Sequence, residues 1–175
     1  MIDFKVRRLS TNDTRPLFDC GDADLNEFFQ KDSIESYRQL LAVTYAIEQN
    51  NELVAYFSVS NDAIKKESFP KSAFKRATSF IPHCKIYSSL PAVKIGRLAT
   101  SKCKQSNGIG SEILNFIKGW FTEGNKTGCR FIIVDANNNP DTIGFYEKNG
   151  FLLLSQKDKS DDTRLLYFDL FNFRR

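Results

Sequence analysis

Histidine is almost absent from this sequence of 175 residues, which contains only His83. A Ser-His-Asp triad would have to use that one residue, and a histidine cluster for a metal ion is excluded. The four cysteines are scattered, with no C-x-x-C pair among them: Cys20, Cys84, Cys103 and Cys129. We therefore expect reduced thiols rather than a disulfide framework or a zinc site, and a chemistry that uses no metal.

Long apolar runs are missing as well. No segment approaches the length of a transmembrane helix, and residues 1–8 lack the apolar stretch of a signal peptide. Internal repeats, linkers and low-complexity tails are also absent. A chain of 175 residues with an apolar fraction of 41% suits one packed core. We therefore expect one cytoplasmic domain over residues 1–175, without a membrane partner.

Acidic residues are scarce in the middle of the chain. Residues 64–104 contain ten lysines and arginines but a single acid, Glu67, so their formal charge is +9. The other residues contain fifteen cations and twenty acids and sum to −5. This asymmetry favours a polyanionic ligand or partner, although charge runs are commonly solvated surfaces and part of the charge could serve cofactor phosphates.

The hydrophobic patterns predict a mixed α/β sheet with inserted helices. Strands are expected over residues 5–9, 44–48, 53–59, 93–100, 131–136, 151–154 and 164–170. Helices are expected from a capping box at Asp24 and Glu27 towards residue 41, over residues 72–78, between Gly110 and Gly124, and from Asn139-Pro140 to Asn149-Gly150. The continuous apolar run of residues 131–136 is typical of a strand buried on both faces.

A glycine-containing turn, QSNGIGS over residues 105–111, follows the predicted strand of residues 93–100. Two glycines so spaced let successive N–H groups point into one concavity, where a pyrophosphate can bind at a helix N-terminus. Downstream, the apolar strand of residues 132–136 is followed by GFYEKNGF at residues 144–151. Together these segments resemble the acetyl-CoA site of the GNAT superfamily of N-acetyltransferases. An ordinary structural turn is the alternative, and a Rossmann fold fits poorly because the turn lies late in the chain.

The resemblance implies a single-domain α/β fold, with a mixed, mostly antiparallel sheet flanked by helices and splayed at its central strands. It also implies acetyl-CoA as cosubstrate, with a backbone N–H near Leu98 polarising the thioester carbonyl. The implied cofactor-binding residues are Leu98, Ala99, Thr100, Gln105, Ser106, Asn107, Gly108, Ile109, Gly110, Ser111 and Asn138. Asn138 could instead be a plain loop or cap residue.

Tyr146 stands where the resemblance implies a general acid for the leaving thiolate. A phenol with a pKa of about 10 can protonate a thiolate of similar basicity without being ionised itself at pH 7. The alternative is that Tyr146 only packs with Phe145 and Phe151. We expect Phe145 to lie in the core and Tyr146 to point elsewhere on its helix.

No general base is evident, which favours an α-amine as acceptor, because an α-amine with a pKa near 8 is about a tenth deprotonated at pH 7. The segment FDCGDADLNEFF, residues 18–29, resembles the opening of a GNAT branch whose toxins acetylate the α-amine of aminoacyl-tRNA. Residues 96–99 and 144–146 match that branch, whereas Thr100-Ser101 and Ser106-Asn107 depart from it. The candidate residues for the substrate or for tRNA are Lys65, Lys66, Lys71, Lys75, Arg76 and Arg97.

The resemblance implies further partners, namely an antitoxin protein for a toxin of this kind and a second copy of the chain. Acetylation of a small molecule or of a protein amine is an alternative to acetylation of aminoacyl-tRNA. A non-catalytic module that only binds coenzyme A is the other alternative.

Overall fold

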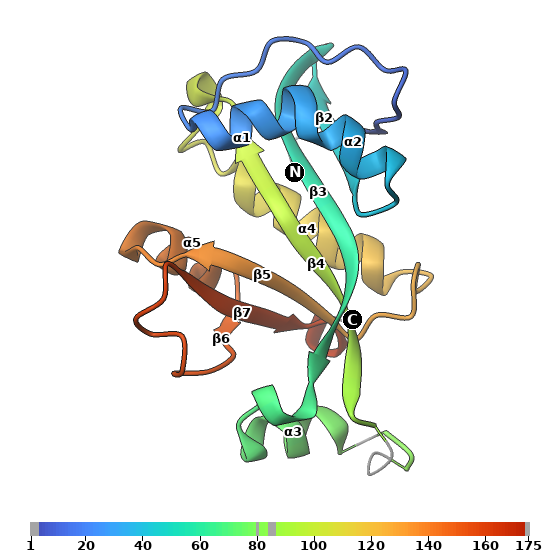
Figure 1. Ribbon diagram of the computed structural model, residues 1–175, viewed down its shortest axis with the longest axis vertical. Coiled ribbons are helices and arrows are strands. Elements are labelled where there is room, and N and C mark those ends of the chain that lie inside the picture. The colour runs from blue at the N-terminus through green and yellow to red at the C-terminus, as the bar shows by residue number, and fades with distance from the viewer. Residues whose placement is uncertain (1–3, 80, 84–86, 174–175) are drawn as a thin grey trace. The chain divides into compact units, whose positions relative to one another are not determined.

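The computed structural model describes residues 4–79, 81–83 and 87–173. Its strands are β1 (Lys5–Arg8), β2 (Val43–Gln49), β3 (Glu52–Lys65), β4 (Ser89–Thr100), β5 (Phe131–Asn137), β6 (Leu152–Leu153) and β7 (Thr163–Asp169). Its α-helices are α1 (Ala23–Glu27), α2 (Ser33–Arg38), α3 (Lys71–Thr78), α4 (Ile109–Thr122) and α5 (Pro140–Lys148) (Figure 1). Shorter helical segments are the π-helix η1 (Phe28–Asp32) and the 3-10 helices η2 (Lys66–Ser68), η4 (Lys102–Lys104) and η5 (Leu170–Phe173). Cys84 and Lys85, which entered the cysteine and charge counts, lie outside the described residues.

The strands follow the order β1-β2-β3-β4-β5-β7-β6 in one seven-stranded sheet. The pairs β1–β2, β2–β3, β5–β7 and β6–β7 are antiparallel. A tight turn joins β2 to β3, with Asn50 and Asn51 both at positive φ, a region that asparagine tolerates. The predicted α/β class with a mostly antiparallel sheet is thus confirmed, and the splay at the central strands stays a prediction.

Contacts divide the chain into two compact units, and β3, β4 and α4 contribute residues to both. The first unit comprises Met1–Ser60 and Ile95–Phe116, and the second comprises Asn61–Lys94 and Ile117–Arg175. The single domain expected over residues 1–175 stays a prediction.

The core of the first unit forms around Tyr56 of β3. Its ring is completely buried and lies 4.9 Å from the ring of Phe29 and 5.3 Å from that of Phe18, measured between centroids. The Tyr56 hydroxyl donates to the Leu25 carbonyl oxygen at 2.7 Å, which satisfies its polar end inside the core. Ala99 of β4 belongs to the same cluster. The helical segment of residues 23–32 is thereby fixed against β3 and β4.

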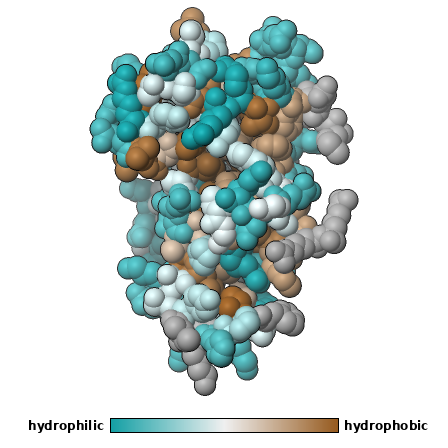
Figure 2. All heavy atoms as spheres, turned by 90° about the vertical axis from the view of Figure 1, so that its right-hand side faces the viewer, coloured by the Kyte–Doolittle hydropathy of each residue, from teal (hydrophilic) through white to brown (hydrophobic). Residues whose placement is uncertain are grey.

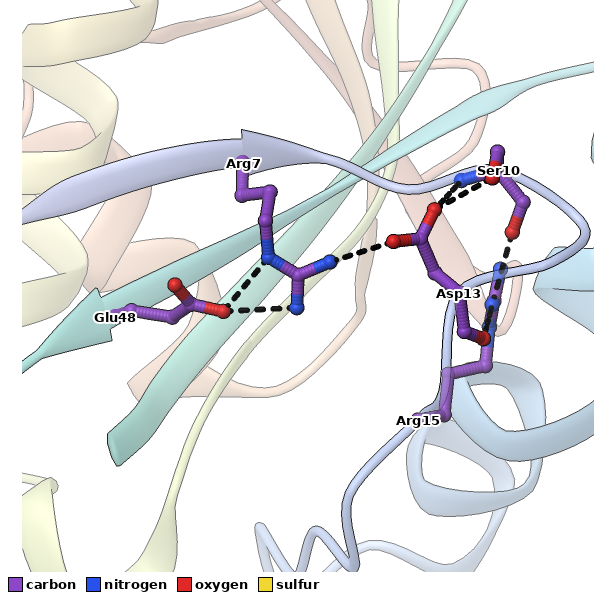
Figure 3. A network of polar contacts seen from close by, with 5 residues as sticks. All are labelled: Arg7, Ser10, Asp13, Arg15 and Glu48. Carbon is purple, nitrogen blue, oxygen red and sulfur yellow. Dashed lines mark hydrogen bonds and ion pairs between the residues drawn. The ribbon is translucent and has the colours of Figure 1, made fainter. Parts of the chain in front are cut away.

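A polar network holds the segment that follows β1 (Figure 3). Arg7 donates to Glu48 at 2.9 Å and to Asp13 at 2.9 Å, and Arg15 donates to the carbonyl oxygens of Ser10 and Asp13. The hydroxyl and N–H of Ser10 donate to the Asp13 carboxylate, and these bonds lower the pKa of that carboxyl. These bonds hold residues 10–15, the segment after β1, next to Arg7 of β1.

The core of the second unit combines β5, β7 and α3. Residues 131–134 are all buried, as predicted for a strand covered on both faces. The Phe69 ring lies 5.6 Å from the rings of both Phe131 and Tyr167, and α3 adds Ala73 and Ala77. The cluster secures the basic segment around α3 to the sheet.

The predicted elements are found, but several of their boundaries differ. Strand β3, predicted over residues 53–59, extends to Lys65, and β6, predicted over residues 151–154, comprises only Leu152–Leu153. The expected helix over residues 72–78 is confirmed as α3. The predicted cap at Asp24 is wrong, because Gly21 turns the chain at φ +84 and the Asp22 carboxylate accepts from the Leu25 N–H at 3.0 Å. Strand β4 begins at Ser89, four residues before the predicted start, and it includes Pro91, a residue that is uncommon inside strands because it lacks an N–H donor. The long N-terminal helix is divided by η1.

None of the helices formed by the described residues is both long and apolar enough to span a membrane. The face drawn in Figure 2 is mostly hydrophilic, and its hydrophobic side chains form small separate groups.

Candidate active site

The glycine turn leads directly into α4. Ser106 and Gly108 have φ values of +64 and +77, so the chain reverses its twist twice within three residues. Gly108 begins the helix, because its carbonyl oxygen accepts from the Glu112 N–H at 3.1 Å. Such alternation turns neighbouring N–H groups towards one side, where they join the positive end of the helix dipole. The turn therefore has the backbone geometry of an anion site.

Two cations flank this turn that the sequence analysis did not name as site residues. Lys102 and Lys104 lie in η4, immediately before Gln105. Both belong to the positively charged segment of residues 64–104, which was the available signal. Their position next to the turn adds positive charge where a diphosphate would bind.

The turn is braced by the loop between β1 and α1. The side-chain amide of Gln105 donates to the Cys20 carbonyl oxygen at 2.7 Å and to that of Thr100 at 3.1 Å. The Lys102 N–H donates to the Asp19 carbonyl oxygen at 2.9 Å. The Asp19 carboxylate accepts from the Gly21 N–H at 2.8 Å, the main cause of the lowered pKa of that carboxyl. The segment that carried the resemblance to toxin GNATs thus supports the candidate phosphate-binding turn.

Strand β4 presents Leu98, Ala99 and Thr100 just before that turn. Ala99 is buried in the core of the first unit, whereas Leu98 and Thr100 are half-buried, as the alternation of side chains along a strand requires. Arg97 is exposed, and its guanidinium carbon lies 5.1 Å from the centre of the Phe28 ring. The first unit therefore brings together all the predicted cofactor-binding residues of the range 98–111.

Tyr146 belongs to α5, in the second unit. The helix begins where the Asn139 side chain accepts from the Thr142 N–H at 2.9 Å. Tyr146 is 7% exposed and its ring meets those of Phe145 and Phe151 edge to face. Phe145 is only half-buried, so the expected division of the two residues is wrong: Tyr146 is the one that packs in the core. The Phe151 ring, three residues beyond the end of α5, packs against the buried Tyr146 ring.

Burial raises the pKa of Tyr146 to about 12. A phenol with this pKa stays protonated at neutral and mildly alkaline pH. It is therefore a permanent hydrogen-bond donor and a weaker acid than a phenol in water.

Asn138 uses its side chain to hold a loop. Its amide nitrogen donates to the carbonyl oxygens of Lys159 at 3.0 Å and Asp161 at 2.8 Å. Its backbone N–H donates to the Asp162 carbonyl oxygen at 2.9 Å. These bonds agree with the loop role that the sequence analysis gave as the alternative.

The candidate substrate cations of the second unit gather at the end of β3 and on α3. All five are exposed: Lys65, Lys66, Lys71, Lys75 and Arg76. The Lys66 ammonium lies 5.3 Å from the centre of the Phe74 ring. Burial raises the pKa of the Tyr167 phenol, and the nearby Arg76 guanidinium offsets part of that rise. Lys94 of the same charge run pairs with Asp135. The pairing removes Lys94 from the cations available to a ligand, while the α3 group remains exposed.

A strand that leads through a turn with two positive-φ residues into a helix N-terminus is a backbone arrangement that can hold a phosphate-bearing cofactor. A family profile described as the Acetyltransferase (GNAT) domain matches residues 41–152. The chain belongs to the GNAT acetyltransferase family. The sequence-based prediction of an acetyl-CoA-dependent N-acetyltransferase is thus confirmed at the level of the family.

Solved structures share this fold over nearly the whole chain. The AtaT toxin complexed with acetyl-methionyl-tRNAfMet has a TM-score of 0.80 and 21% identity, covering 98% of this chain and 97% of that one. A tyrosine-to-phenylalanine variant of AtaT, bound to the C-terminus of the antitoxin AtaR and to acetyl-CoA, has a TM-score of 0.73 and 20% identity, covering 97% and 95%. A tyrosine-to-phenylalanine variant of KacT has a TM-score of 0.76 and 21% identity, covering 97% and 96%. At these identities the likeness shows the fold.

Proposed function

We propose that this protein transfers the acetyl group of acetyl-CoA to the α-amine of aminoacyl-tRNA in the cytoplasm, as the toxin of a toxin–antitoxin pair. The observation that carries the proposal is the reversed turn at Gly108 at the start of α4, within a GNAT domain. The likeness to AtaT complexed with acetyl-methionyl-tRNAfMet supports the choice of acceptor.

In this proposal the cofactor lies along β4, with its diphosphate at the N-terminus of α4. Backbone N–H groups of the turn bind the diphosphate, Lys102 and Lys104 add charge, and the pantetheine arm pairs with residues 98–100. Gln105 contributes by bracing the turn, and Asn138 by holding its loop, rather than by side-chain contacts to the cofactor.

The reaction forms one C–N bond and breaks one C–S bond. The neutral amine attacks the thioester carbonyl, and a backbone N–H near Leu98 stabilises the oxyanion. Collapse of the tetrahedral intermediate expels the thiolate, to which Tyr146 donates a hydrogen bond and then its proton. The nitrogen loses its proton to solvent, and the phenol regains its own. The high pKa of Tyr146 favours the hydrogen-bonding part of this role.

The exposed cations around α3 are proposed to bind tRNA phosphates. Contacts of this kind supply affinity without reading sequence, and they weaken with salt. The antitoxin is proposed by likeness to the AtaT structure that contains the C-terminus of AtaR.

The decisive experiment incubates the purified protein with labelled acetyl-CoA and charged tRNA, with a protein mixture and small amines as rival acceptors. We expect label in the aminoacyl ester, and loss of most of the transfer in Tyr146→Phe. Tyr45→Phe, at a half-buried tyrosine of β2 to which no role in binding or transfer is assigned, is the control and should transfer normally. If label appears only in protein or in small amines, aminoacyl-tRNA is not the acceptor. Binding of acetyl-CoA without any transfer would favour a non-catalytic binding module.

A further inference from the structure

A buried cation on α4 has no part in the chemistry described above. Lys118 is 4% exposed, and its ammonium donates to the Asn149 carbonyl oxygen at 2.6 Å. Its Nζ lies 4.4 Å from the centre of the Phe168 ring, 5.6 Å from that of Phe151 and 6.0 Å from that of Phe173. All these residues belong to the second unit.

The position of Lys118 within α4 is one where an apolar residue is expected. Leu114, one turn before it, and Ile117 next to it are completely buried, and Phe121, three residues on, is 5% exposed. A cation on such a face is costly unless other groups satisfy it. Here a helix-end carbonyl and three aromatic ring faces stabilise the ammonium. No ion pair of the described residues includes Lys118, so no carboxylate explains its presence.

The carbonyl that Lys118 binds lies at the end of the helix that carries Tyr146. The N–H groups of Asn149 and Phe151 both donate to the Tyr146 carbonyl oxygen at 3.0 Å. The Phe151 ring, which faces Lys118, also meets the Tyr146 ring at 5.4 Å between centroids. The ammonium is therefore joined to Tyr146 by two short routes, one through the backbone and one through packed rings.

We propose that Lys118 is a positioning residue for Tyr146: its ammonium ties the C-terminal end of α5 to α4 and so fixes the direction of the phenol. The inference rests on the proposed function, because the direction of the phenol matters only if Tyr146 acts on the leaving thiolate. A residue that acts through another should have no effect once that other is removed.

The test is a double-mutant cycle on acetyl transfer with Lys118→Met and Tyr146→Phe. Methionine keeps the apolar stem and removes the donor. We expect Lys118→Met to lower kcat by about tenfold in the parent, as a small misplacement of a catalytic group does, with KM for acetyl-CoA unchanged. In the Tyr146→Phe background the same substitution should change kcat less than twofold. Lys118→Arg, which keeps the charge and can reach the same carbonyl, should recover most of the parent kcat.

An equal loss of kcat from Lys118→Met in both backgrounds would overturn the inference, and so would an unchanged kcat in the parent. The cycle also includes Tyr146→Phe alone. If that variant keeps the kcat of the parent, Tyr146 is not the general acid, and the proposed function fails rather than the role of Lys118. Should Lys118→Met fail to fold, Lys118→Gln is the replacement, since its amide can still donate and predicts an intermediate kcat. The inference would also be overturned if Lys118→Gln had the kcat of the parent, or if it lowered kcat equally with Tyr146 and with Phe at position 146.

Discussion

The side-chain amide of Gln105 donates to the Cys20 carbonyl oxygen at 2.7 Å, across 85 positions of sequence. This bond ties the loop before α1 to the glycine turn. The same amide reaches the Thr100 carbonyl oxygen, so a single side chain joins the turn both to that loop and to β4. The loop between β1 and α1 therefore supports the candidate phosphate site through the carbonyl oxygen of Cys20.

Removal of this brace should weaken cofactor binding without affecting the chemical step. We expect Gln105→Ala to raise the dissociation constant for acetyl-CoA by about tenfold, since the loss of two hydrogen bonds is worth about 1 to 2 kcal/mol. Calorimetry measures the constant, and kcat at saturating cofactor should stay within twofold of the parent. The control is Gln39→Ala, because Gln39 donates to Glu35 within its own helical segment. An acetyl-CoA affinity for Gln105→Ala equal to that of the control would contradict the bracing role.

Gly108 offers a test of the turn's conformation alone. Its φ is +77, and a Cβ there would meet no atom within 4 Å, so Gly108→Ala adds only the strain of the left-handed conformation, about 1 kcal/mol. Gly124, at φ +72 and with equally free space, is the matched control after the other end of α4. Both variants should lose similar stability in thermal unfolding, whereas only Gly108→Ala should bind acetyl-CoA more weakly. If the two lose affinity equally, the turn is not the phosphate site.

The exposed cations of α3 should act on the acceptor and not on the cofactor. We expect Lys71→Glu combined with Lys75→Glu to raise KM for aminoacyl-tRNA several-fold and to leave KM for acetyl-CoA unchanged, because phosphate contacts supply affinity. The slope of log affinity against log salt should become shallower by about one for each lysine. Lys126→Glu, an exposed lysine outside the positive segment, is the charge-matched control. An unchanged salt slope would mean that these lysines are only a solvated surface.

Local chemistry made much of this architecture predictable. Asn139 and Pro140 begin α5, and Gly150, at φ +79, ends it, as the sequence predicts. Long-range packing is where the prediction failed. The burial of Tyr146 rather than Phe145 depends on Phe151 and on how α5 lies against the sheet, and helical periodicity alone does not contain that information.

Lys118 shows the same limit for the candidate site. A pattern of apolar and polar residues assigns a lysine to solvent, and only the carbonyl of Asn149 and three distant rings make it a core residue. The hydrogen bond between Gln105 and Cys20 could likewise not be predicted from hydrophobic periodicity, because it joins residues far apart in the chain. What sequence does predict well are caps, turns and strands, whose causes lie within a few residues.

The pH dependence of the rate offers the last test, because burial lowers the pKa of Lys118 to about 8 while that of Tyr146 is raised to about 12. Lys118 is charged below pH 8 and becomes neutral above it, so its hold on Asn149 weakens as the pH rises. The groups around it, a carbonyl and three phenyl rings, carry no charge that could obscure its titration.

The substrate amine and Tyr146 contribute equally to the parent and to Lys118→Arg, whose guanidinium stays charged throughout. We therefore expect the ratio of kcat, parent over Lys118→Arg, to be constant from pH 6 to about 7 and to fall through a midpoint near 8. Stopped assays across pH 6 to about 10 measure this ratio, and the pH limits follow from the range in which an α-amine acceptor and a lysine titrate. Only the Lys118 ammonium titrates differently in the two proteins. A ratio that does not change with pH would therefore mean that the charge on Lys118 does not affect the action of Tyr146.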